Sequence, residues 1–179
     1  MKKNSKTAKI IVSVAVVLIT AMLLVFFVLR LNRRSSLLEN EGQYTCTISI
    51  MCDTILNNMD KLDPEKKEIV PEGGVMLAAE SVGFNEGETV FDVLYKTARK
   101  HKLHFEFTDS TIYDSPYIEG IGNLYEFDCG ELSGWMYCVN KYYPNYGMGE
   151  YKLKDGDVIE IVYTCDLGAD VGNSYQGDE

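Results

Sequence analysis

The sequence predicts an α+β domain with one main helix, preceded by a single transmembrane helix. Three observations carry this prediction: short segments in which apolar and polar residues alternate, one segment with apolar residues at helical spacing, and a long uncharged run near the N-terminus. Alternation with a period of two is typical of half-buried strands, and spacings of three and four residues are typical of a helix against a core. One helix among several strands favours the α+β class.

The uncharged run covers residues 10–29. A helix of these twenty residues would be about 30 Å long, which matches the hydrocarbon core of a bilayer. Secretory h-regions usually have about 7–15 residues and end at a small-residue cleavage site, whereas arginines follow this run. We therefore expect an uncleaved signal-anchor, with residues 1–9 as a cytoplasmic tail and residues 30–42 as a short stalk.

Cysteine placement and charge indicate where the rest of the chain works. All five cysteines follow the anchor, and disulfides persist in oxidising compartments. We expect a single-pass protein of the cell membrane whose domain, residues 43–171, is extracellular and ends in a flexible tail at residues 172–179. Residues 41–179 carry 26 Asp or Glu against ten Lys or Arg, so nucleic acid is not an expected partner.

The elements of the domain follow from local patterns. Thr89 to Asp92 fits a capping box with Asp in place of the usual Glu, and the stripe Val90, Leu94 and Ala98 continues it as a helix to about Lys102. A helical turn is expected over residues 54–62. The expected strands are residues 44–52, 75–82, 103–107, 117–127 (interrupted by two glycines), 135–140 and 158–163.

Five cysteines cannot all pair within one chain. If the first strand lies parallel to the last, their C-terminal ends coincide and bring Cys52 near Cys165. Cys129 with Cys138 is the expected second bridge, across the turn at residues 133–134, which leaves Cys46 unpaired. The sequence contains no Cys-x-x-Cys, so structural bridges are favoured over a redox-active role.

The sequence predicts neither catalysis nor a metal site. His101 and His104 are the only histidines, and two ligands make a poor metal site. Ser133 lacks the preceding glycine of a nucleophile elbow. Glu126 and Asp128 fall on one face of an expected strand, which leaves a two-carboxylate glycosidase as the third alternative. We expect no enzyme, no metal and no covalently bound cofactor.

Aromatic residues are concentrated between residues 113 and 151. Such amphipathic rings make rigid binding surfaces for planar ligands, glycans or proteins, and the alternative is that half of them pack the sheet. The stretch contains the only tryptophan, Trp135, and eight tyrosines: Tyr113, Tyr117, Tyr125, Tyr137, Tyr142, Tyr143, Tyr146 and Tyr151.

An ordered set of motifs lies within this domain. In order they are TVFDVL at residues 89–94, YIEGI at 117–121, LYEF at 124–127, SGWMYCVN at 133–140 and LKDGDVI at 153–159. With these motifs, residues 43–171 resemble the transcobalamin-like C-terminal domain family. The resemblance implies a β-grasp-like mixed sheet packed on one main helix.

The resemblance also implies a ligand and a place for it. In the animal cobalamin carriers this domain covers one face of the corrin, and the segment around Trp135 matches the part nearest the ligand. The implied ligand-binding residues are Trp135, Tyr137, Asn140, Tyr142, Tyr143 and Tyr146. The carriers hold the other face with a helical-barrel domain that we do not expect here, so the affinity should be modest.

The leading functional expectation is a membrane-anchored extracellular module that captures cobalamin or another corrinoid and presents it to a membrane importer. The alternative is a structural or adhesive module of the cell surface that binds protein or glycan through the same tyrosines.

Overall fold

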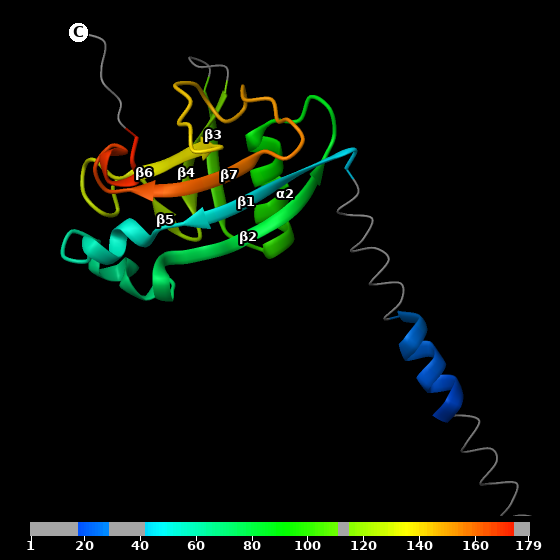
Figure 1. Ribbon diagram of the computed structural model, residues 1–179. Coiled ribbons are helices and arrows are strands. Elements are labelled where there is room, and N and C mark those ends of the chain that lie inside the picture. The colour runs from blue at the N-terminus through cyan, green and yellow to red at the C-terminus, as the bar shows by residue number, and fades with distance from the viewer. Residues whose placement is uncertain (1–17, 29–41, 111–114, 174–179) are drawn as a thin grey trace, which may run out of the picture. The chain divides into compact units, whose positions relative to one another are not determined.

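The computed structural model describes residues 18–28, 42–110 and 115–173 (Figure 1). The chain divides into two units, Met1–Glu41 and Gly42–Glu179. In the first unit, residues 18–28 are helical. Within the three described ranges, no helix is both long enough and apolar enough to cross a membrane. The expected tail at residues 1–9, the rest of the expected anchor and residues 30–41 of the expected stalk lie outside these ranges.

A four-stranded mixed sheet is the main element of the second unit (Figure 1). Its strand order is β2-β1-β7-β6, and the strands are β1 (Tyr44–Met51), β2 (Val75–Phe84), β6 (Gly134–Val139) and β7 (Val158–Thr164). The central pair β1 and β7 is parallel, with Thr47 opposite Val158 and Met51 opposite Val162, and the other pairs are antiparallel. The predicted parallel pairing of the first and last strands is therefore confirmed.

Helix α2 (Val90–His101) packs against one face of this sheet. The predicted capping box is confirmed: the Thr89 hydroxyl accepts a hydrogen bond from the Asp92 amide at 3.3 Å, and the Asp92 carboxylate accepts one from the Thr89 amide at 2.9 Å. Val90 and Leu94 are fully buried in one cluster with Ile48 of β1 and other side chains of the sheet. The mixed α+β architecture with one main helix in this unit agrees with the prediction.

A second, three-stranded sheet has the order β3-β4-β5. Its strands are β3 (Phe105–Ser110), β4 (Ser115–Ile121) and β5 (Leu124–Tyr125). The single interrupted strand expected over residues 117–127 is wrong, because Gly122 and Asn123 both adopt positive φ and reverse the chain, so that β4 and β5 pair antiparallel. Glu126 and Asp128 consequently lie in the turn after β5 and do not share a strand face.

Short 3₁₀ helices flank the sheet at the end where β1 and β7 finish. They are η1 (Asp53–Asn57), η2 (Pro64–Ile69), η3 (Glu72–Gly74) and η4 (Ala169–Val171). The helical turn expected over residues 54–62 is therefore shorter than predicted. A second buried cluster lies beside these helices and consists of Cys52, Ile55, Leu62, Leu124, Cys129, Tyr163 and Cys165.

Candidate functional site

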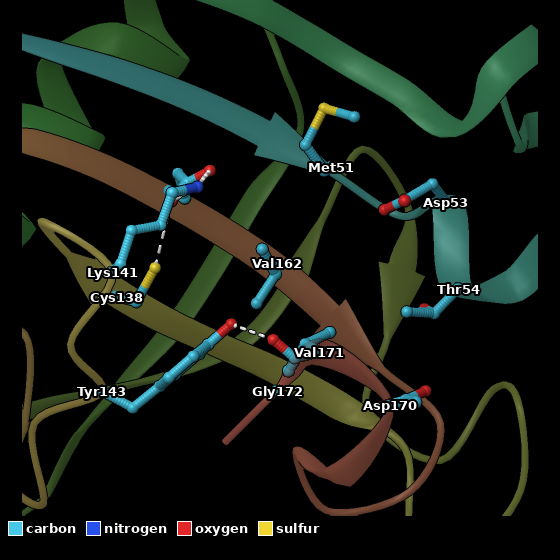
Figure 2. A pocket seen from close by; sticks show the side chains of 11 residues that line it. Met51, Asp53, Thr54, Cys138, Lys141, Tyr143, Val162, Asp170, Val171 and Gly172 are labelled. Atoms are coloured by element: carbon cyan, nitrogen blue, oxygen red, sulfur yellow. Dashed lines mark hydrogen bonds and ion pairs between the residues drawn. The ribbon is translucent and has the colours of Figure 1, made fainter. Parts of the chain in front are cut away.

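Among the pockets that the described residues of the second unit form, two are considered as ligand sites. The first, here called the Trp135 pocket, encloses about 350 Å³ beside β6. Its lining is Tyr117, Glu126, Phe127, Glu131, Leu132, Ser133, Gly134, Trp135, Met136, Thr164 and Leu167. The second, here called the Glu160 pocket, encloses about 530 Å³, and its lining is Met51, Asp53, Thr54, Cys138, Lys141, Tyr143, Glu160, Val162, Asp170, Val171 and Gly172 (Figure 2).

Trp135 is held in a fixed orientation at its pocket. Its indole N–H donates a hydrogen bond to the Leu124 carbonyl at 2.9 Å, and its ring meets Tyr163 edge-on with centroids 5.2 Å apart. The Tyr163 phenol in turn donates to the Tyr125 carbonyl at 2.7 Å and lies 2.9 Å from the Ser133 hydroxyl oxygen. These contacts tie β5, β6 and β7 together, so the indole is preorganised by the buried residues behind it.

Exposed apolar side chains surround Trp135. Scattered exposed hydrophobic residues are ordinary, but a contiguous group marks a surface that contacts another molecule. Here four large side chains line one pocket although each is largely exposed: Tyr117, Phe127, Leu132 and Leu167. We call these four residues the apolar rim.

Two members of the apolar rim have strained backbone. Phe127 has φ of 67° and Leu167 has φ of 48°, in the left-handed region that costs a residue with a Cβ about 1–2 kcal/mol. Backbone hydrogen bonds from the Phe127 amide to Ser133 at 3.0 Å and from the Leu167 amide to Leu132 at 2.9 Å maintain these conformations. Strained residues cluster at functional sites, and here the strain holds two apolar side chains, 61% and 68% exposed, in the solvent.

The polar groups of the Trp135 pocket are acidic or neutral. The Tyr117 phenol donates a short hydrogen bond to the Glu126 carboxylate. Burial, followed by this hydrogen bond and the charge of Glu126, raises the pKa of Tyr117 to about 12, so the phenol stays protonated at neutral pH. Glu131 adds a second carboxylate. The pocket therefore suits a neutral or cationic ligand with an apolar face.

The Glu160 pocket lies on the face of the sheet opposite α2. Ile159 and Ile161 are fully buried in the core with the helix, so Glu160 between them points to the other face. The Lys141 ammonium lies 2.7 Å from both oxygens of the Glu160 carboxylate, and the Cys138 thiol donates to the same carboxylate at 3.3 Å (Figure 2). The hydrogen bond from Lys141 is the main cause that lowers the pKa of Glu160.

The structure divides the six predicted ligand-binding residues between different environments. Trp135 lines its own pocket, whereas Tyr143 lines the Glu160 pocket and donates a hydrogen bond to the Val171 carbonyl at 2.7 Å (Figure 2). Tyr137 is buried in the main core, where its phenol donates to the Tyr146 carbonyl at 2.9 Å.

The remaining three predicted residues line neither of the two pockets. Asn140 stabilises the turn before β7, because its amide group donates to Asp157 at 2.8 Å and accepts from the Val158 amide at 3.0 Å. Tyr142 is 61% exposed, and Tyr146 stacks on Tyr151 with centroids 6.2 Å apart. These six predicted residues thus do not form one surface.

Sequence patterns do not identify Phe127, Leu132 and Leu167 as site residues. Periodicity places Phe127 in a strand, and Leu132 and Leu167 lie in loops, where an apolar residue has no periodic partner. An apolar residue isolated among acidic residues, such as Phe127 between Glu126 and Asp128, was the available indication.

The cysteines are free and buried in the structure, so the predicted bridges are not formed in it. Cys129 and Cys138 are in different surroundings: the Cys129 thiol donates to the Asn58 carbonyl at 3.5 Å in the second core, and Cys138 contacts Glu160. Cys138 lies at the Glu160 pocket, away from the second core, so the structure does not bring the two cysteines together and their pairing stays a prediction. Cys46, predicted to be unpaired, lies in the main core.

The titratable groups singled out in the sequence have separate partners. His101 lies 2.9 Å from Glu80, whereas His104 lies 3.4 Å from Glu106. The Asp128 carboxylate accepts from the Tyr125 amide at 2.8 Å and lies 3.3 Å from the Lys66 ammonium. Across residues 18–28, 42–110 and 115–173, no group of three or more His, Cys, Asp or Glu side chains could hold a metal ion.

Comparisons with known proteins give one family match and distant structural neighbours. Residues 87–164 match the model described as "Domain of unknown function (DUF4430)". None of the curated proteins matches the chain. The fold is similar to haptocorrin in complex with Cbi, with 14% identity and a TM-score of 0.47 over 71% of this chain and 27% of that one.

A second solved structure is a protein from Ruminococcus gnavus provisionally named as metal-binding. Its identity is 10% and its TM-score is 0.38, over 68% of this chain and 97% of that one. This chain therefore spans about a quarter of the haptocorrin chain and most of the Ruminococcus protein. The segment matched by DUF4430 contains α2 and the strands from β3 to β7.

Proposed function

We propose that residues 42–173 form a ligand-binding module and that its ligand lies in the Trp135 pocket. The apolar rim carries this proposal: four large apolar side chains lie exposed around an indole fixed by its hydrogen bond, and two of the four keep an unfavourable backbone conformation. Selection for stability alone would replace Phe127 and Leu167 by glycine or a polar residue. Contact with a ligand accounts for the presence of these two apolar residues at strained, exposed positions.

The shape of the pocket restricts the ligand. A cavity of about 350 Å³ is too small to enclose a large ring system but presents an apolar surface to one face of it. The sequence resemblance over residues 43–171 makes cobalamin, or another corrinoid, the first ligand to test. Contact with one face should give a modest affinity, with a Kd on the order of 10 μM.

Calorimetric titration of the full-length chain with cobalamin tests the proposal. We expect heat of binding from the wild type and at least a tenfold weaker Kd from the double variant Phe127→Gly, Leu167→Gly. Tyr142→Ser is the matched control, because Tyr142 is as exposed as Phe127 but lies outside both pockets. Absence of heat from the wild type would contradict the corrinoid proposal.

The alternative occupant of the apolar rim is a protein or glycan of the cell surface. In that case the full-length chain should be retained by cell-wall fractions without cobalamin, and the double variant should lose retention. A chain that binds cobalamin and is not retained supports the first proposal.

We also propose that residues 10–29 anchor the module in the cell membrane and that the ligand passes to a membrane importer. The uncharged run and the arginines after it support the anchor. The stalk of residues 30–42 reaches at most about 40 Å, which suits transfer to a neighbouring membrane protein. Membrane fractionation tests the anchor: the chain should be released by detergent and not by high salt, and release by salt alone would contradict it.

A further inference from the structure

Three cysteines from distant parts of the chain meet in the second core. Cys52 directly follows β1, Cys129 lies between β5 and β6, and Cys165 directly follows β7. All three are buried, and they pack with Leu124 and Tyr163, the two residues that fix Trp135 from behind. The cluster therefore lies beneath the Trp135 pocket.

Within this cluster, Cys129 and Cys165 lie close enough for each to affect the pKa of the other. Both thiols are also held by η1 and the residue after it: Cys165 Sγ lies 3.8 Å from Thr54 Oγ1, and Cys129 Sγ lies 3.5 Å from the Asn58 carbonyl oxygen. Cys52 lies near enough for the charge of Cys165 to contribute to its raised pKa.

We propose that Cys129 and Cys165 form a disulfide bond in the oxidised chain, with Cys52 left as a thiol. The bond would join the β5–β6 connection to the end of β7. Phe127 lies two residues before Cys129, and Leu167 lies two residues after Cys165. The bridge would thus couple the two strained residues of the apolar rim and hold the pocket in its binding conformation.

Formation of the bond needs an external disulfide, such as oxidised glutathione. The Cys129 thiolate attacks one glutathione sulfur and releases the first glutathione thiolate. The Cys165 thiolate then attacks the Cys129 sulfur of the mixed disulfide and releases the second. The two cysteines lose two protons and two electrons, and the electrons reduce oxidised glutathione to two glutathione molecules.

Burial determines when this exchange takes place. Burial is the largest cause that raises the pKa of Cys129 to about 12, and it raises the pKa of Cys165 as well. Because the thiolate is the attacking species, exchange within the closed core is slow. The bond should therefore form during folding, and the folded reduced chain should resist alkylation.

Peptide mapping of the full-length chain tests the pairing. The chain is refolded with reduced and oxidised glutathione, its free thiols are alkylated under denaturing conditions, and it is cleaved with trypsin. Cys129 lies in the peptide of residues 103–141, Cys165 in residues 155–179, and both Cys46 and Cys52 in residues 35–61. We expect residues 103–141 linked to residues 155–179. The mass of the linked pair should be lower by two hydrogen atoms than the sum of the two separate peptides in which Cys138 is alkylated and Cys129 and Cys165 are free thiols.

Variants separate the alternatives, because residues 103–141 also contain Cys138. The link should persist in Cys138→Ala and Cys46→Ala and be absent from Cys129→Ala. Reduction of the wild type should lower its Tm by on the order of 10 °C. A link between residues 35–61 and 155–179, a link lost in Cys138→Ala, or alkylation of all five cysteines in the refolded wild type would overturn the proposal.

Discussion

Phe127 is a large apolar residue in a conformation that glycine adopts without cost. Its side chain is mostly in solvent, so its removal gives up little buried area. Phe127→Gly should relieve about 1–2 kcal/mol of strain and lose about 0.5–1 kcal/mol through the greater entropy of unfolded glycine. We therefore expect the free energy of unfolding in urea to rise by up to about 1.5 kcal/mol.

Phe84→Ala is the matched control for this substitution, because Phe84 is fully buried in the main core. Removal of its ring should lower the free energy of unfolding by about 3–5 kcal/mol. If Phe127→Gly lowers the free energy of unfolding to a similar extent, Phe127 stabilises the fold. Its strained backbone then does not indicate a ligand site.

The ion pair of Glu160 and Lys141 makes stability depend on pH. The pKa of Glu160 is lower in the folded state than its ordinary value, so the pair stabilises the fold above the unfolded-state pKa and this contribution is lost as the pH falls through the folded-state pKa. Lys141→Gln should reduce the free energy of unfolding at pH 7 and have no effect at a pH below both pKa values. Urea denaturation of both chains across this range measures the difference, and a constant difference would contradict the electrostatic account.

Helix α2 was predictable because its determinants are local. The capping box and the apolar stripe lie within one stretch of sequence, and the structure confirms both. Thr89→Ala removes the side-chain acceptor of the Asp92 amide and should lower the free energy of unfolding by about 1 kcal/mol. Thr89→Ser keeps the acceptor and should have a much smaller effect in the same urea measurement. An equal decrease in the free energy of unfolding in both variants would show that the side-chain cap does not stabilise the helix.

Strands β4 and β5 were not predictable as a pair, because their separation depends on two residues at positive φ. Apolar residues continue through Gly122 and Asn123, so periodicity indicates one strand where the chain turns back. The expectation of one continuous strand places Glu126 on a strand face and gives no indication that Phe127 is a site residue. Local sequence patterns identify the elements here. They do not show that the chain reverses its direction at a glycine and an asparagine that adopt positive φ.

Tyr163 connects β7 to the residues that carry the Trp135 pocket. Tyr163→Phe keeps the ring against Trp135 but removes the hydroxyl that donates to the Tyr125 carbonyl. The substitution should therefore lower the free energy of unfolding by about 1–3 kcal/mol. The emission of Trp135 should also shift to longer wavelength if the indole becomes more exposed. An unchanged free energy of unfolding would show that the hydroxyl is not needed to hold the pocket.

The Trp135 pocket exists only in the folded chain. Its apolar rim comes from β4, from the β5–β6 connection and from the segment after β7, and sequence patterns do not bring these segments together. Of the six ligand-binding residues that the sequence resemblance implies, Trp135 alone lines this pocket. The parallel pairing of β1 and β7 was inferred correctly and places Cys52 near Cys165, but the approach of Cys129 depends on how the β5–β6 connection packs on η1.

The fluorescence of Trp135 tests most directly whether the ligand lies against this residue. Trp135 is the only tryptophan in the chain, so its emission reports on this pocket without background from other sites. Cobalamin should quench the emission saturably in the wild type and in Tyr142→Ser, after correction with free tryptophan for absorbed light. The double variant Phe127→Gly, Leu167→Gly should show no saturable quenching. Equal quenching in the wild type and the double variant, or heat of binding without any change at Trp135, would contradict the account.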